Sequence, residues 1–168
     1  MEKLRIGIIG TGAIAHKHML AYLNQPDVEI AAASDVIPGK AEAFLKQYGI
    51  DAPGFEDHLS MLRAVKLNAV SVCSYNSTHC VCTVDALEHG AHVLLEKPMA
   101  VTLDEAVKIC RAEKKSGKMV SVGFQPRMDA NMQMIKKIVE SGELGRVYYI
   151  QTGGGRRHGI PVWARRAI

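Results

Sequence analysis

The sequence has little that suits a secreted, metal-binding or membrane-spanning protein. Its cysteines, Cys73, Cys80, Cys82 and Cys110, form no C-x-x-C pair, so they indicate buried reduced thiols and no metal site is predicted. No apolar run is long enough to cross a membrane, and the apolar stretch at residues 6–9 is too short for a signal peptide. We therefore expect a cytoplasmic protein with no membrane partner.

Charge of one sign is also scarce over most of the chain. The net charge of +4 comes entirely from arginines after residue 150, where no acidic residue balances them. Residues 1–150 are neutral and carry no basic stripe, which argues against a nucleic-acid surface. With 168 residues, 48% of them hydrophobic, the chain can form one domain and part of a second.

The strongest pattern lies in residues 5–15, Arg-Ile-Gly-Ile-Ile-Gly-Thr-Gly-Ala-Ile-Ala. Its β-branched residues predict a short, buried parallel strand. Gly10 permits a tight turn, Gly12 lets a pyrophosphate approach the backbone, and Ala15 lets the next helix pack on the strand. The start of that helix would face the phosphates. A glycine turn in another α/β unit is the alternative. The predicted cofactor contacts here are Gly10, Thr11, Gly12, Ala13 and Ile14.

Asp35 ends the next predicted strand, residues 28–34. In a dinucleotide-binding unit such an acid accepts hydrogen bonds from the ribose hydroxyls of the adenosine half. Its charge would repel a 2′-phosphate, which favours NAD over NADP, although Lys40 is close enough to keep NADP possible. The alternative is a loop aspartate that caps the helix predicted over residues 38–48.

Strands and helices alternate along the first 124 residues. This alternation predicts an α/β fold with a Rossmann-type, doubly wound parallel sheet. After residue 124 the pattern changes to a helix over residues 131–141 and a strand over residues 145–152. The other predicted strands are residues 69–73, 92–95 and 120–124, and the other predicted helices are residues 14–23 and 57–65, one ending at His89, and one that begins after a Thr102–Glu105 capping box and ends at Gly117.

Ligands of such sheets bind beyond the carboxyl ends of the strands. Lys97 is the candidate catalytic residue there, because a partly desolvated lysine can stabilise an alkoxide as hydride leaves for a nicotinamide. Glu96 can hold it. The alternative, a surface Glu-Lys pair before a turn proline, is slightly favoured by spacing alone. His16 and His18 lie two residues apart and cannot share a helical face, so we interpret them as solvent or packing residues.

From Gly7 to Pro161 the chain resembles the glucose–fructose oxidoreductase and inositol dehydrogenase family (Gfo/Idh/MocA). The resemblance implies an NAD(P)-dependent oxidoreductase that acts on a sugar, cyclitol or related alcohol, with Lys97 as a catalytic residue and a homo-oligomer at full length. The matching residues are 7–15, Asp35, Asn76 with His79, Glu96-Lys97-Pro98, Arg127 and 142–146. The cofactor contacts implied beyond the glycine turn and Asp35 are Ser74, Tyr75, Asn76, His79, Glu96, Lys97 and Arg127.

The sequence departs from the family pattern in two loops and at its end. Ser74-Tyr75-Asn76 replaces the usual Thr-Pro-Asn, and Gln125-Pro126 replaces a more polar pair. The resemblance covers only about the first half of such an enzyme. We therefore expect residues 1–124 to be the NAD(P)-binding domain and residues 125–168 the connecting helix and first strand of an incomplete α+β substrate domain.

Residues 156–163 resemble the opening of that substrate domain, and the expected Asp…His pair does not follow. We expect a truncated or frame-shifted reading frame whose 168-residue product is inactive alone. The alternative function, from another class, is a stand-alone dinucleotide-binding or redox-sensing module without catalysis.

Overall fold

The computed structural model describes residues 3–154. The chain separates into two compact units, with the division between Gly123 and Phe124. Residues 156–163, which resemble the opening of a substrate domain, lie outside the described residues. Within residues 3–154, no helix combines the length and the apolar character that a bilayer span requires.

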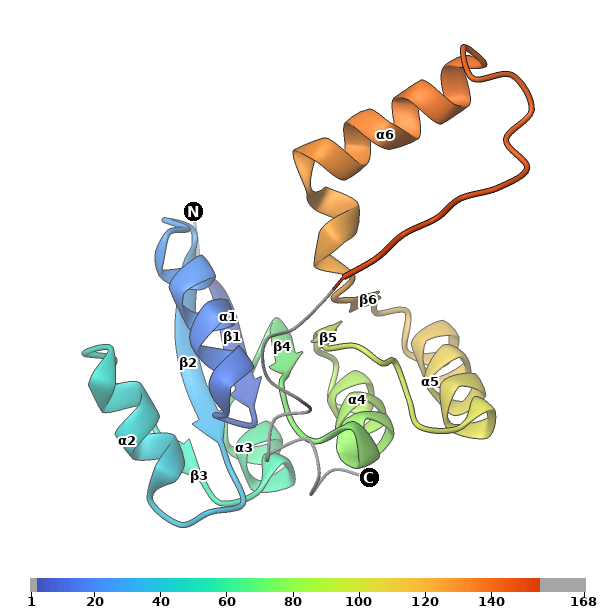
Figure 1. The fold of residues 1–168 in the computed structure, drawn as a ribbon. Coiled ribbons are helices and arrows are strands. Elements are labelled where there is room, and N and C mark those ends of the chain that lie inside the picture. The colour runs from blue at the N-terminus through green and yellow to red at the C-terminus, as the bar shows by residue number, and fades with distance from the viewer. Residues whose placement is uncertain (1–2, 155–168) are drawn as a thin grey trace. The chain divides into compact units, whose positions relative to one another are not determined.

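The first unit is built on one parallel sheet with the strand order β3-β2-β1-β4-β5-β6 (Figure 1). Every neighbouring pair runs parallel. The chain winds outward from β1 in both directions, so the order reverses between β1 and β4, where open sheets form their ligand crevice. The strands are β1 (Leu4–Ile9), β2 (Val28–Ser34), β3 (Gly54–Phe55), β4 (Ala69–Val72), β5 (His92–Leu95) and β6 (Val120–Val122).

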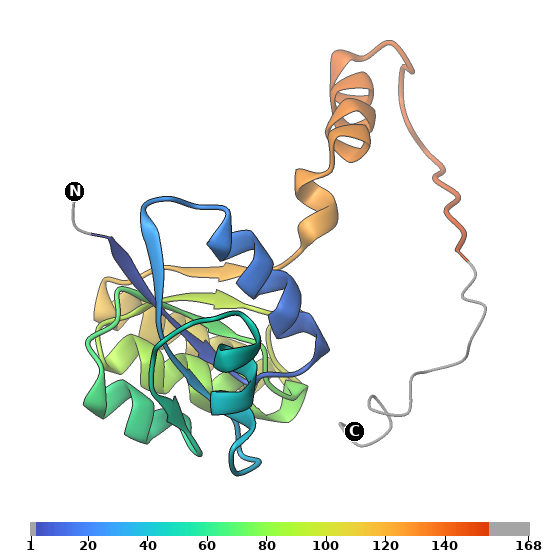
Figure 2. The same ribbon diagram turned by 90° about the vertical axis from the view of Figure 1, so that its left-hand side faces the viewer.

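Helices cover both faces of the sheet (Figure 2). One apolar cluster, with Ile8, Met19 and Phe44, joins β1 and β2 to α1 and α2. A second cluster, with Leu87 and Ile109, joins β4 and β5 to α3, α4 and α5. The expected Rossmann-type, doubly wound sheet is thereby confirmed. The helices are α1 (Ala13–Leu23), α2 (Lys40–Gln47), α3 (His58–Ala64), α4 (His79–Glu88) and α5 (Leu103–Ser116).

The second unit contains α6 (Ala130–Ser141), which follows a 3₁₀ turn, Gln125–Met128. Asp129 caps α6 by accepting hydrogen bonds from two backbone N–H groups of the first turn, and Gly142 ends it in the left-handed conformation. The strand predicted over residues 145–152 is wrong, because these residues are not assigned to any strand. A strand needs a neighbour to satisfy its backbone groups, and no partner strand pairs with this segment among residues 3–154.

Candidate functional site

The glycine turn lies where β1 ends beside β4. Gly10 has a φ of 84°, and a Cβ atom there would lie 2.8 Å from the backbone N and Cα atoms of Ser74. Any larger residue would push the two strand ends apart. Ala15 is fully buried, so α1 packs directly against the sheet. The turn therefore has the close strand-to-helix packing that the sequence predicts.

The start of α1 suits an anionic group. Gly12 is the N-cap residue, it supplies no side-chain hydrogen bond to the first turn, and a Cβ atom built on it would meet nothing within 4 Å. Open space thus lies in front of backbone N–H groups at the positive end of the helix dipole. Thr11, Ala13 and Ile14 flank this space in sequence. A dinucleotide pyrophosphate fits these features.

Asp35 lies on the β2 side of the glycine turn. Its Oδ2 atom accepts hydrogen bonds from the Thr11 backbone N at 2.9 Å, Thr11 Oγ1 at 2.7 Å and Lys40 Nζ at 2.8 Å. Its Oδ1 atom accepts one from Ile37 N at 3.1 Å. Although burial acts to raise the pKa of this carboxyl, the hydrogen bonds from Lys40, Thr11 and Ile37 lower it below its ordinary value.

These contacts test the alternative interpretation of Asp35, whereas its contact with a ribose stays a prediction. The N-cap residue of α2 is Gly39, so the alternative that Asp35 caps this helix is wrong. Each carboxylate oxygen can accept about two hydrogen bonds. Oδ1 therefore retains capacity for a ribose hydroxyl, whereas Oδ2 is already fully engaged. Lys40, which the sequence leaves as a possible partner of a 2′-phosphate, is held by Asp35 instead.

The loop after β4 lies on the other side of the glycine turn. It runs through Ser74 and Tyr75 into a 3₁₀ turn, Asn76–Thr78. The Thr78 hydroxyl donates to Ser74 Oγ at 2.8 Å. Tyr75 is half exposed, at 52%, and Asn76 is partly buried. Their contacts with a cofactor stay predictions.

His79 joins this loop to the one after β5. Its ring is buried, with 1% exposure. Nδ1 lies 2.7 Å from the Pro98 carbonyl oxygen, and Nε2 lies 3.3 Å from the Ser74 carbonyl oxygen. The imidazole thus connects the two loops that the sequence assigns to the nicotinamide. A direct contact between His79 and a cofactor stays a prediction.

Glu96 and Lys97 follow β5 directly. Glu96 is buried, and its carboxylate accepts hydrogen bonds from His18 Nε2 at 3.0 Å and from the Lys97 backbone N at 3.3 Å. Lys97 itself is exposed. The described residues do not bury Lys97, because the end of β5 carries the residue out of the sheet, and its expected partial desolvation stays a prediction. Its place beside the strand ends is as expected.

Arg127 belongs to the second unit. Its guanidinium carbon lies 5.6 Å from the centre of the Phe124 ring, within the range of a cation–π contact. Its predicted contact with the cofactor stays a prediction.

His18 is the residue that sequence reasoning missed. Its side chain is only 9% exposed and pairs with Glu96, so the interpretation as a solvent or packing histidine is incomplete. The available signal was its spacing from Tyr22. Residues four apart share one helix face, and both side chains meet the buried Ser71 of β4. His16 points elsewhere, to Tyr48 at 2.7 Å.

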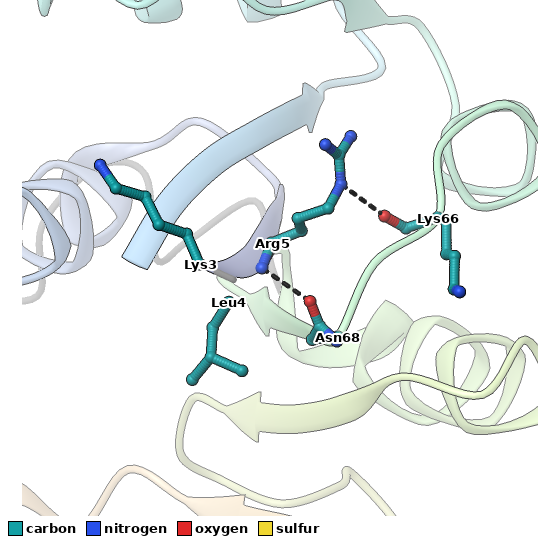
Figure 3. A pocket seen from close by; sticks show the side chains of 5 residues that line it. All are labelled: Lys3, Leu4, Arg5, Lys66 and Asn68. Atoms are coloured by element: carbon teal, nitrogen blue, oxygen red, sulfur yellow. Dashed lines mark hydrogen bonds between the residues drawn. The ribbon is translucent and has the colours of Figure 1, made fainter. Parts of the chain in front are cut away.

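A pocket at the opposite end of the central strands is separate from this site. Figure 3 shows that it is lined by Lys3, Leu4, Arg5, Lys66 and Asn68. The Arg5 side chain donates to the Lys66 carbonyl oxygen at 3.0 Å, and its backbone N donates to Asn68 Oδ1 at 2.8 Å. The pocket lies at the amino ends of β1 and β4, whereas Asp35, the glycine turn and Glu96 lie at the carboxyl ends.

Two curated relatives align with most of this chain. D-glucoside 3-dehydrogenase of Escherichia coli (strain K12) is 38% identical over 161 residues, which are 95% of this chain and 46% of that protein. Inositol 2-dehydrogenase of Salmonella typhimurium (strain LT2) is 34% identical over 145 residues, 85% of this chain and 43% of that protein. The chain thus spans about half the length of the curated relatives it matches.

Two solved structures share the fold. The WlbA dehydrogenase from Chromobacterium violaceum, in complex with NADH and UDP-GlcNAcA, has a TM-score of 0.83 and 27% identity, and the match covers 88% of this chain and 43% of that one. The scyllo-inositol dehydrogenase from Lactobacillus casei, with bound NAD(H) and scyllo-inositol, has a TM-score of 0.79 and 25% identity, and the match covers 86% and 43%.

The sequence pattern of a single family matches residues 4–124, which include the glycine turn, Asp35 and the loops after β4 and β5. That family is described as an oxidoreductase family with an NAD-binding Rossmann fold. This chain belongs to it, the Gfo/Idh/MocA family, and carries its NAD-binding domain.

Proposed function

We propose that this chain is the cofactor-binding part of an oxidoreductase that transfers hydride between NAD and a secondary hydroxyl of a sugar, cyclitol or related compound. One observation carries the proposal. The glycine turn lies at the reversal of strand order between β1 and β4, with Asp35 at the end of β2 on one side and Glu96-Lys97 at the end of β5 on the other. A dinucleotide has an adenosine end and a nicotinamide end. The site offers Asp35 for the first and Glu96-Lys97 for the second.

The residues of this chain have separate roles in the proposal. Gly10 and Gly12 leave room for the pyrophosphate beside α1, and Asp35 accepts a hydrogen bond from a hydroxyl of the adenosine ribose. The loops of residues 74–79 and 96–98 hold the nicotinamide half. When bound, the nicotinamide supplies hydride chemistry. The exposed Lys97 donates from Nζ to the substrate oxygen and stabilises the negative charge that develops there.

The division of the chain follows from the same proposal. Residues 1–124 are the NAD-binding domain, and residues 125–168 begin a substrate domain.

The whole protein is proposed to be a cytoplasmic homo-oligomer. Free cysteines support the location, since Cys73, Cys80, Cys82 and Cys110 form no disulfide and a reducing compartment keeps thiols in this state.

NAD remains the preferred cofactor in the proposal, with NADP possible. Asp35 is held ionised beside the glycine turn, which disfavours a 2′-phosphate, while Lys40 lies 2.8 Å from it and offers the one positive charge in contact with Asp35 among the described residues. Titrations of the chain with NADH and NADPH, followed by the fluorescence of the bound nicotinamide, measure the preference directly.

The test of the reaction is a Lys97→Met variant in a polypeptide that continues past residue 168 as its relatives do. We expect NADH binding to change by less than about threefold, since Lys97 Nζ is proposed to contact the substrate oxygen and not the cofactor, and hydride transfer to a panel of sugars and cyclitols to fall by at least about a hundredfold. Lys118→Met, a lysine before the amino end of β6 and thus away from the carboxyl ends of the strands, is the control. Equal activity of both variants would contradict the role of Lys97.

The alternative is a dinucleotide-binding or redox-sensing module without catalysis. The observation in its favour is that the glycine turn, Asp35 and both nicotinamide loops up to Pro98 all lie within residues 3–123. In that case the Lys97→Met variant and the parent would bind NADH alike, and no alcohol in the panel would be oxidised by either polypeptide.

A further inference from the structure

A chain of buried polar side chains runs from α1 to the end of β5. His18 Nδ1 lies 3.1 Å from Ser71 Oγ, and His18 Nε2 lies 3.0 Å from Glu96 Oε1. Tyr22 Oη lies 2.6 Å from Ser71 Oγ. Ser71 is fully buried, and the side chains of His18 and Glu96 are 9% and 7% exposed. Three elements, α1, β4 and the β5 end, are thus connected by four polar groups.

The chemistry of these groups fixes part of the proton arrangement. A carboxylate oxygen only accepts, so His18 Nε2 carries the proton and donates to Glu96. In the neutral imidazole, Nδ1 then accepts from the Ser71 hydroxyl, which in turn accepts from Tyr22. Burial raises the pKa of the Tyr22 phenol, against the opposing effect of the Ser71 hydrogen bond, so Tyr22 stays a neutral hydroxyl donor. Each of the four groups has a partner in this arrangement.

Stability alone does not explain a buried polar chain of this kind. Buried polar and charged groups can often be replaced by apolar residues of similar volume at little cost in stability. These four side chains instead orient the Glu96 carboxylate, because hydrogen bonds fix its orientation more narrowly than apolar contacts do. The other oxygen of that carboxylate, Oε2, accepts from the Lys97 backbone N at 3.3 Å.

One helix therefore serves both halves of the site. The N-terminus of α1 begins at Gly12, where the pyrophosphate fits. More than one turn further along, His18 reaches across β4 to the residue that precedes Lys97. A shift of the His18 side chain would change the position of the Glu96 carboxylate, at the proposed nicotinamide end, and leave the first turn of α1 in place.

We propose that His18 is a positioning residue for the nicotinamide half of the cofactor site, holding the Glu96 carboxylate and through it the main chain at Lys97. The inference rests on the proposed function, since it requires a dinucleotide whose nicotinamide lies beside Glu96-Lys97. It assigns His18 no contact with the cofactor.

Two ligands separate this role from a merely structural one. ADP-ribose has the adenosine and pyrophosphate groups of NADH and lacks the nicotinamide. Calorimetric titration of the chain with each ligand measures the two ends of the site independently. We expect His18→Leu to weaken NADH binding by about five- to tenfold, comparable to the loss of one ordinary hydrogen bond, and to leave ADP-ribose binding within about twofold.

Two further variants sharpen the comparison. The side-chain amide of His18→Gln can donate to Glu96 as Nε2 does, so this variant should recover most of the NADH affinity. His16→Leu is the matched control on the same helix. The His16 ring contacts Tyr48 and Phe44 and none of the polar groups that bind His18, so we expect this change to affect the two ligands equally or not at all.

Each result bears on the proposal. An equal loss of NADH and ADP-ribose affinity in His18→Leu would overturn it, as would unchanged affinity for both ligands. If His18→Leu does not fold, as judged by its thermal transition, Ser71→Ala tests the same chain of contacts and should show a smaller loss confined to NADH. If the parent chain binds neither ligand, the proposed function itself fails, and that outcome is distinct from the others.

Discussion

At the scale of the residue, the contact between Asp35 and Lys40 bears on the proposed choice between NAD and NADP. Three donors already engage Oδ2, and one of them is the Lys40 ammonium at 2.8 Å. A ribose hydroxyl has to use the less engaged Oδ1 or displace Lys40. Since Lys40 is 38% exposed at its side chain, it can turn away when a ligand arrives. We therefore expect cofactor preference to depend on the pair rather than on Asp35 alone.

Asp35→Ala should therefore change the preference of the chain. We expect NADH to lose about 1.5–3 kcal/mol of binding free energy with the carboxylate. NADPH should lose less or gain, because the repulsion disappears and Lys40 becomes available to its 2′-phosphate. Fluorescence titration with both reduced cofactors measures this, with the exposed Asp51→Ala as control. Equal weakening of both cofactors would show that Asp35 does not contact the ribose.

A second residue-scale prediction concerns His58. A side-chain hydrogen bond with Cys82 and the pairing with Asp85, whose Oδ2 lies 2.7 Å from Nε2, raise the pKa of His58 to about 9 against the effect of burial. The raised pKa means that the folded protein binds this proton more tightly than the unfolded chain. The stabilisation is then complete below the unfolded pKa of about 6.5 and is lost as the pH rises through about 9.

Urea unfolding at pH 6, 8 and 10 tests this dependence. Because the pair is partly exposed, we expect His58→Gln to cost about 1–2 kcal/mol at pH 6 and much less at pH 10. Asp85→Asn should show the same trend. A cost for His58→Gln that is independent of pH would mean that the imidazole contributes packing and no charge.

At the scale of the element, most of the first unit is predictable from sequence. Strand β2 (Val28–Ser34) and strand β5 (His92–Leu95) have the predicted ends, because β-branched and apolar runs between turn residues give a clear signal. Strand β3 (Gly54–Phe55) was missed, since two residues carry no period and only the neighbour β2 makes them a strand. The strand predicted over residues 145–152 does not form for the opposite reason: the pattern is strand-like, but no partner strand pairs with it among residues 3–154.

The candidate site was predictable to a similar extent. Motif spacing locates Gly10, Asp35 and Lys97 at the strand ends. It cannot reveal that Lys40 holds Asp35 or that His18 holds Glu96, since these contacts join residues from different elements, and His18 and Glu96 are 78 positions apart in the chain.

The capping box of α5 gives a prediction for a single element. Thr102 Oγ1 accepts from Glu105 N at 3.3 Å, and the Glu105 carboxylate accepts from Thr102 N at 3.1 Å. Thr102→Ala should lower the free energy of unfolding by about 1 kcal/mol, whereas Thr102→Ser should cost almost nothing. Chemical denaturation of the three proteins at one pH measures both differences. A similar loss in both variants would indicate that the threonine methyl, and not its hydroxyl, stabilises this end of the helix.

At the scale of the whole molecule, the first unit contains the groups proposed to bind the cofactor, whereas turnover of a substrate requires more. The groups proposed for the pyrophosphate, the ribose and Lys97 all lie within the first unit. Oxidation of an alcohol also requires a surface that orients the substrate and a base that takes its proton. Orientation can contribute roughly 7–11 kcal/mol to lowering a barrier, and a positioned base about 10²–10⁴-fold in rate. Lys97 can stabilise charge, but one exposed side chain cannot orient a sugar.

We therefore expect a polypeptide of residues 1–168 to bind NADH weakly and to show no measurable dehydrogenase activity. A polypeptide extended to the length of its relatives should be active, and this activity should depend on Lys97. The measurement pairs NADH fluorescence titration with a hydride-transfer assay on sugars and cyclitols, using Lys97→Met as the control for background reduction. Robust turnover by residues 1–168 would show that an acid–base group already lies within them. His79 would then be tested first, because its ring joins the two loops proposed to hold the nicotinamide.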